Sequence, residues 1–244
     1  MNVLHTCAAV LRDPESFATD DARAALEEHG PTLLGIIVVS AAIFGIVVGT
    51  YRGGIQLAFA GAKLPLLWLL PLVVALPAMR ALYRVGGIAV SYAQVGLATA
   101  VGVARATVLL AVASPALWLM YSVHVDYHVA VLALAGSLVA AGLLGAITIG
   151  AVLPGRGPAK TLVHACAVIA MGVVFAQSGW VLRPFIARPR ADVAFMRPVE
   201  SNVFDSVAAS WRSARGRYTG WDARKEGLLA DPQEVETAET ARPR

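Results

Sequence analysis

The chain has 244 residues, of which 57% are hydrophobic and only 15% are charged, and its mean hydropathy is +0.66. Because an ordinary soluble domain is about 25% charged, this composition excludes that class and indicates a polytopic membrane protein. The formal net charge of +4 is unevenly placed, with nine basic and four acidic side chains in residues 183–225 but two basic and five acidic ones in 226–244.

The composition divides the chain into four regions. We expect a polar N-terminal helical segment (1–30), a transmembrane helical domain (31–182), a basic extended and amphipathic membrane-surface segment (183–225) and a disordered acidic tail (226–244). In the first region, Asp13 before Pro14 is a helix start signal and Gly30 is a stop signal, so the pattern predicts a short polar helix over 14–29.

The transmembrane domain reads as five helices. Residues 31–50 carry no charge, and about 20 residues are the length that a helix needs to cross ~30 Å of hydrocarbon. Further spans are expected over 64–79, 101–121, 129–153 and 161–182, which gives an all-α fold; a sixth span is possible if the apolar run 86–123 divides in two.

Two stretches between these spans are expected at the membrane surface. Residues 51–63 are predicted to form an interfacial or re-entrant connection, and 87–99 an interfacial amphipathic piece that leaves Arg105 near the headgroups.

Small residues recur every fourth position in two spans, which predicts helix faces where another helix backbone can approach closely. The first face carries Ala41, Gly45, Gly49 and Gly53, and the second carries Ser137, Ala141 and Gly145.

Prolines and polar side chains inside the spans mark a possible pathway. Pro71 and Pro77 each remove an internal hydrogen bond and are expected to bend the second span, while His164 and Gln177 are polar groups of the fifth. A channel or carrier with its path along the bent span is therefore one functional hypothesis.

The turn His124-Val-Asp126-Tyr-His128 is the sharpest local pattern with metal-binding chemistry. In an extended segment, alternate residues face one way, so two imidazoles and a carboxylate would converge on a divalent metal. Such a site would make the chain a metal-dependent membrane enzyme, which is a remote functional hypothesis. The alternative, which we favour, is an interfacial turn whose polar side chains keep its backbone solvated.

The residues after the last span are predicted to contact lipid or a soluble partner. The residues expected to make these contacts are basic or aromatic: Arg183, Arg188, Arg190, Phe204, Trp211, Arg212, Arg215 and Arg217.

No serine-hydrolase, zinc-protease or phosphate-loop motif occurs in the sequence, and the spans contain no Asp or Glu. We therefore expect no catalysis, no cofactor and no nucleic-acid binding. The expected partners are membrane lipids and other membrane subunits, or a second copy of the chain.

The stretch Gly86-Gly87-Ile-Ala-Val-Ser-Tyr-Ala-Gln94, followed by Ala113-Ser-Pro-Ala116, resembles the Yip family of five-span membrane-trafficking proteins and its bacterial relatives. The stretches 49–56, 63–65, 183–185 and 197–201 are similar to uncharacterised bacterial multi-pass proteins. The second resemblance implies a bacterial inner-membrane location and no known activity. The small-residue faces and the basic tail favour a scaffold or accessory subunit of a membrane complex.

Overall fold

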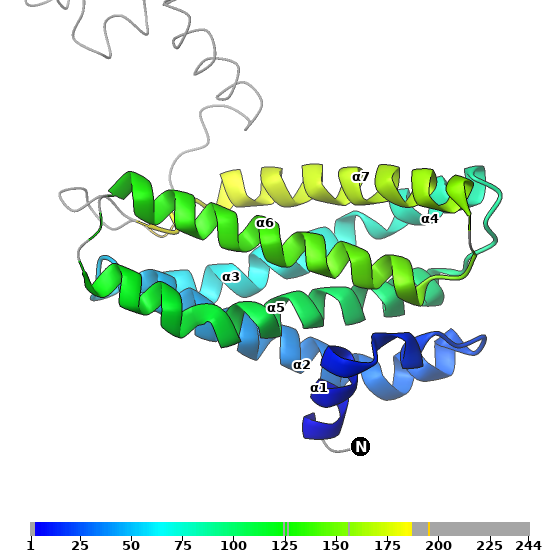
Figure 1. The fold of residues 1–244 in the computed structure, drawn as a ribbon, viewed down its shortest axis with the longest axis horizontal. Coiled ribbons are helices and arrows are strands. Elements are labelled where there is room, and N and C mark those ends of the chain that lie inside the picture. The colour runs from blue at the N-terminus through cyan, green and yellow to red at the C-terminus, as the bar shows by residue number, and fades with distance from the viewer. Residues whose placement is uncertain (1–2, 124, 126, 156, 187–194, 196–244) are drawn as a thin grey trace, which may run out of the picture. The chain divides into compact units, whose positions relative to one another are not determined.

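The computed structural model describes residues 3–123, 125, 127–155, 157–186 and 195, without the side chain of His128. In this part of the chain every regular element is helical (Figure 1). The elements are α1 (Val3–Arg12), the 3-10 helix η1 (Pro14–Phe17), α2 (Ala22–Gly49), α3 (Gln56–Val74), α4 (Leu76–Val85), α5 (Tyr92–Ser122), α6 (Tyr127–Val152) and α7 (Pro158–Leu182).

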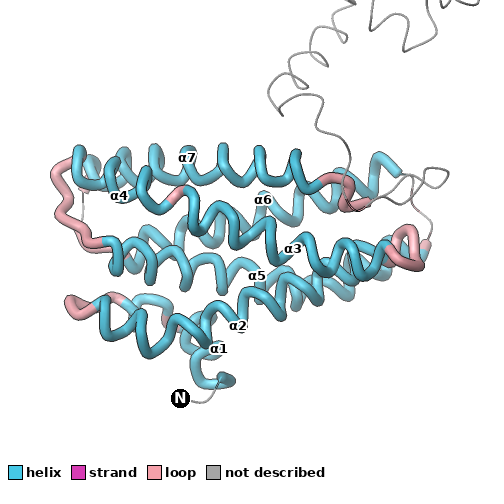
Figure 2. Tube along the Cα trace, turned by 180° about the vertical axis from the view of Figure 1, so that it is seen from behind, coloured by secondary structure: helices cyan, strands magenta, loops and turns pink. Residues whose placement is uncertain are grey.

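Five helical stretches are long and apolar enough to cross a membrane, which confirms the all-α multi-pass fold. They are α2, α3 with α4, α5, α6 and α7. The turns between them alternate between two ends of the bundle, as the tube in Figure 2 shows. We call the end that holds η1 and the start of α7 the N-terminal side, and the end that holds residues 50–55 and Arg183 the opposite side.

The first transmembrane helix is longer than expected. α2 begins at Ala22, where the Asp21 carboxylate accepts a hydrogen bond from the backbone N–H of Ala24 (3.2 Å), and it passes through Gly30 and Pro31 without a break. The predicted helix over 14–29 with a stop at Gly30 is therefore wrong. Leu26 packs beside Gly96 of α5, so tertiary packing continues the helix across a local stop signal.

Neither expected surface connection is a separate element. Residues 56–63 are the first two turns of α3, and 92–99 are the first two turns of α5. A capping box fixes the start of α5: Ser91 Oγ accepts from the N–H of Gln94 (3.1 Å), and the Gln94 side chain accepts from the N–H of Ser91 (2.8 Å).

The predicted bend in the second span is confirmed. The regular α-helix is interrupted by a bend at Ala75, between Pro71 and Pro77, although Ala75 keeps right-handed helical dihedrals, and α4 continues from there to the N-terminal side.

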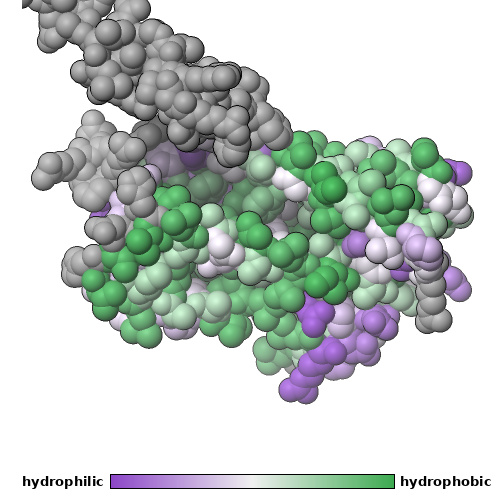
Figure 3. Space-filling view, turned by 45° about the horizontal axis from the view of Figure 1, so that its top comes forward, coloured by the Kyte–Doolittle hydropathy of each residue, from purple (hydrophilic) through white to green (hydrophobic). Residues whose placement is uncertain are grey.

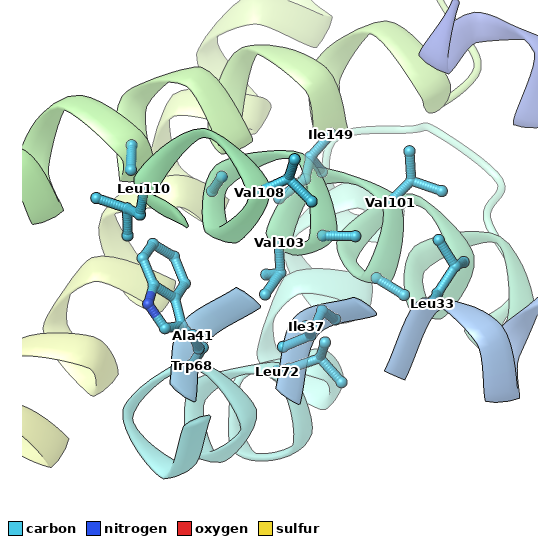
Figure 4. Packing of buried hydrophobic residues seen from close by; sticks show 14 of the residues in the cluster. Leu33, Ile37, Ala41, Trp68, Leu72, Val101, Val103, Val108, Leu110 and Ile149 are labelled. Carbon is cyan, nitrogen blue, oxygen red and sulfur yellow. The ribbon is translucent and has the colours of Figure 1, made fainter. Parts of the chain in front are cut away.

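α5 is the central helix of the bundle. Its most apolar stretch is 78% buried, against 44% for α2, and it packs on both α2 and α6. Figure 4 shows Val103 of α5 pointing toward Ile37 of α2, whereas Val101 and Val108 lie on another side of α5. The remaining helix faces are apolar and exposed, while hydrophilic side chains gather over the N-terminal segment (Figure 3). This distribution fits a bundle surrounded by lipid.

Candidate functional site

The small-residue faces pack inside the chain. A Cβ on Gly45 would overlap the backbone carbonyl of Ala60, and one on Gly49 would lie 2.6 Å from Leu57 Cα, so α3 covers this face of α2. Ala41 is fully buried on the same face, but Gly53 follows the end of the helix and adopts a positive φ of 77°. The predicted close approach is therefore confirmed at Gly45 and Gly49, and the approaching backbone is that of α3 in the same chain.

The second face joins α6 to α5. Gly145 and Gly102 form the crossing point, since a Cβ on Gly145 would lie 3.0 Å from the Gly102 carbonyl oxygen. Ala141 is buried, and the Ser137 hydroxyl donates back to the carbonyl of Ala133 (2.8 Å). The predicted packing role is present at Gly145 and Ala141.

An apolar groove separates α6 from α7. Although the two helices are consecutive, α6 packs mainly on α5, and α7 packs on α3 and α4. Between them lies a cavity of about 300 Å³. Its walls include Gly142 and Gly145 of α6, Gly172 and Phe175 of α7, and Trp68 of α3.

A histidine bridge joins α6 and α7 toward the N-terminal side. The Nε2 atom of His164 donates to the carbonyl of Ala146 (2.9 Å), since a carbonyl can only accept. Nδ1 of the neutral ring is then an acceptor, and it receives the hydroxyl of Tyr83 from α4. Gly150 makes room for the imidazole, because a Cβ there would lie 2.9 Å from Nε2. His164 thus ties three helices together.

The wall of the groove carries a polar atom without a partner. The Trp68 side chain is 2% exposed, and its indole N–H forms no hydrogen bond. The ring meets Phe175 edge to face, with 4.9 Å between centroids. An unsatisfied donor in an apolar interior costs about 1–3 kcal/mol, so a hydrogen bond from this N–H to an acceptor would remove that cost.

Sequence reasoning missed Trp68, although a signal existed. Tryptophan side chains of membrane helices gather at the membrane surface. Trp68 instead lies within three residues of the midpoint of the span Gln56–Val85, which is within about 5 Å along a helix.

A larger cavity of about 870 Å³ lies on the N-terminal side, between the stretch 15–22 and the end of α6. Glu15, Asp20, Gln94 and Lys160 bring polar groups to it. The Lys160 ammonium donates to the carbonyls of Gly150 (2.8 Å) and Leu153 (2.6 Å), so it satisfies the C-terminal end of α6.

Arg105 fastens the N-terminal helix to the bundle. Its guanidinium donates to the carbonyl of Leu11 at the end of α1 and to the hydroxyl of Thr148 in α6, both at 3.1 Å. Arg105 therefore has a packing role. Because α5 already begins at Tyr92, the arginine lies close to the middle of this helix rather than near one end.

Lys63, expected at the membrane surface, is fully buried instead. Its ammonium donates to the carbonyl of Pro184 (3.0 Å) and lies 4.9 Å from the centre of the Phe195 ring, while Gln56 donates to the carbonyl of Phe185 (2.6 Å). These two side chains of α3 fix the chain just beyond α7, and we call this set of contacts the exit latch.

Two of the predicted pathway residues, His164 and Gln177, lie far apart. Pro71 is buried in α3, Pro77 is exposed in α4, and His164 is thirteen residues from Gln177 along α7, or roughly 20 Å. Leu72, Ala75 and Met79 are buried around the bend and make it an apolar contact.

The metal site at His124, Asp126 and His128 stays a prediction. His124, Asp126 and the side chain of His128 lie outside the described residues. Within the described part of the chain, no group of three His, Cys, Asp or Glu side chains could hold a metal ion.

Of the predicted lipid or partner contacts, only Arg183 is described, and its guanidinium lies 3.6 Å from the centre of the Trp180 ring. The others lie outside the described residues: Arg188, Arg190, Phe204, Trp211, Arg212, Arg215 and Arg217.

The outer face of α7 carries a regular apolar stripe. Leu162, Cys166, Ile169 and Val173 are all exposed, and their spacing of four, three and four residues is that of a helix-pairing seam. The most apolar stretch of α7 is only 11% buried, the lowest value of the five spans. We call these four residues the outer stripe.

No family model matches the chain, and neither a curated protein nor a solved structure matches it. The resemblance to the Yip family therefore stays a prediction.

Proposed function

We propose that the chain is a non-catalytic scaffold or accessory subunit of a bacterial inner-membrane complex, and that the outer stripe of α7 contacts a transmembrane helix of its partner. The proposal rests on the outer stripe. Its residues have the spacing of a helix-pairing seam, and they lie on α7, which has the lowest buried fraction of the five spans. The bacterial inner membrane is supported only by the resemblance to bacterial multi-pass proteins.

The packing of the other faces supports this choice. The Gly45 and Gly49 face is filled by α3, and Gly145 meets α5, so both close-approach faces are used within the chain. The outer stripe has a helical seam pattern, and none of the helices in the described part of the chain lies against it.

Cys166 provides a direct test, because it lies on the outer stripe. A Cys7→Ser chain would carry a benzophenone on Cys166, be irradiated in native membranes and be analysed by mass spectrometry. We expect one adduct, whose partner mass also appears in the complex that native mass spectrometry finds for the unlabelled protein.

The matched control attaches the same benzophenone to α2, a helix that packs on α5 and α3. The attachment site is created by Val39→Cys in a chain from which both native cysteines have been removed. Val39 is 59% exposed. Lipid adducts alone from Cys166, or the same adducts from both positions, would contradict a specific partner at α7.

A small channel or carrier is the second candidate, and the break at Ala75 is the observation that favours it. Purified chain in vesicles would then move a solute, and Pro71→Ala would change the rate. A solute panel without flux would rule out transport of those solutes.

A further inference from the structure

The groove between α6 and α7 has the volume of a small-molecule site. Its roughly 300 Å³ is at the lower end of the range for ligand pockets and far below the volume of a partner helix, which is about 10 Å wide. The occupant of the groove is therefore a small apolar molecule or part of one, which makes it distinct from the outer stripe of α7.

The chemistry of the groove narrows the class of ligand. Its glycine and aliphatic walls favour an apolar body, and the rings of Trp68 and Phe175 offer faces and edges to a flat ring. The unpartnered indole N–H of Trp68 favours a ligand that has a hydrogen-bond acceptor.

The depth of Trp68 in the membrane distinguishes between possible ligands of the groove. Trp68 lies near the middle of its span, whereas the ester and phosphate oxygens of a glycerophospholipid lie about 15 Å away, at the edge of the hydrocarbon. An acyl chain has no acceptor at the depth of Trp68, and the carbonyls of a partner helix are already bonded within that helix.

We propose that the groove binds a quinone-type lipid, with its flat ring beside Trp68 and Phe175 and a ring carbonyl oxygen accepting from Trp68 Nε1. Because this nitrogen is buried beneath the groove wall, binding includes a side-chain adjustment of the Trp68–Phe175 pair. The His164 bridge from Ala146 to Tyr83 limits the groove toward the N-terminal side, so an isoprenoid tail would leave laterally between α6 and α7.

Two glycines allow the groove to be filled without disturbing the backbone. A Cβ on Gly142 or on Gly172 would meet no atom within 4 Å, and both residues line the cavity. Gly142→Leu and Gly172→Leu thus place a side chain in the groove from opposite walls. Gly136→Leu is the matched control, because Gly136 is on α6, also has open space around it and does not line the cavity.

The test uses the full chain in phosphatidylcholine nanodiscs with decylubiquinone as the probe. Trp118, Trp180, Trp211 and Trp221 would be changed to Phe, so that the fluorescence reports Trp68 alone. We expect saturable quenching that is lost in both groove-filling variants and kept in Gly136→Leu, with folding of each variant checked by size exclusion and circular dichroism.

The role of the indole N–H has its own measurement. Trp68→Phe in the otherwise native chain keeps a ring but removes the donor, and equilibrium dialysis should find about five- to tenfold weaker decylubiquinone binding. Unchanged affinity in Trp68→Phe would overturn the assigned hydrogen bond.

Two results would overturn the proposal as a whole. One is quenching of Trp68 that rises linearly with the quinone-to-lipid ratio and is equal in Gly136→Leu and the groove-filling variants. The other is saturable, groove-dependent quenching by a phospholipid brominated on its acyl chain with none by decylubiquinone, which would assign the groove to a lipid chain. Neither result changes the test of the α7 partner.

Discussion

At the scale of single residues, glycine decides how closely α2 and α3 approach. Gly45 and Gly49 lie against the backbone of Ala60 and Leu57, so a side chain at either position has no space. In a bilayer, where helices gain little from apolar burial, this close van der Waals contact is a main source of stability.

Gly45→Leu should therefore destabilise the folded bundle by about 1–3 kcal/mol or more, because the side chain would force α3 away from α2. Gly35→Leu is the matched control on the same helix, since a Cβ there meets nothing within 4 Å. Thermal unfolding in detergent should show a lower Tm for Gly45→Leu alone. Equal Tm values for the two variants would be inconsistent with the α2–α3 contact.

The His164 bridge makes a second prediction at this scale. Tyr83→Phe removes the hydroxyl that donates to His164 Nδ1, so we expect a loss of about 0.6–2 kcal/mol. Tyr92→Phe should be neutral in the same unfolding assay, because Tyr92 is exposed and its ring, which lies beneath Arg80, is retained. An unchanged stability of Tyr83→Phe would mean that the bridge contributes nothing.

At the scale of the element, the number of spans was predictable but their starts were not. Hydropathy detects only the apolar stretch of a helix. It therefore predicts that the second and third spans begin at residues 64 and 101, whereas α3 begins at Gln56 and α5 at Tyr92. The first two turns of each helix contain polar residues that this protein buries or caps. Ser91 and Gln94 do show a capping box in the sequence, and that local signal locates the start of α5.

The groove and the exit latch could not be predicted from the sequence for a different reason. Both depend on residues far apart in the chain, such as Lys63 with Pro184 and Trp68 with Phe175, which only the packing of α7 on α3 brings together. The small-residue pattern showed that close approach occurs at Gly45 and Gly49, but not that the partner is the next helix of the same chain.

The exit latch makes the prediction at this scale. Lys63→Met fills the buried position with an apolar side chain but removes the ammonium that donates to the Pro184 carbonyl. Amide hydrogen exchange at Phe185 and Ile186 should then be about tenfold faster or more, since a hydrogen bond from a charged group is worth about 1.5–3 kcal/mol. Arg84→Met, an exposed cation of α4, should leave exchange there unchanged. Equal exchange in Lys63→Met and the native chain would show that the latch does not hold this segment.

At the scale of the whole molecule, burial is distributed unequally over the five spans. α5 is enclosed by its neighbours, whereas α7 has little cover and presents the outer stripe. Under the proposed function, α7 is the helix through which the chain joins its partner.

Native mass spectrometry of the protein extracted with its membrane partners tests this account most directly. Native chain and Val39→Trp should both appear in one complex of defined composition. Ile169→Trp should appear without the partner, because the bulky ring interrupts the outer stripe while Val39 lies on α2. A lone monomer for the native chain, or a complex that persists unchanged in Ile169→Trp, would contradict the account.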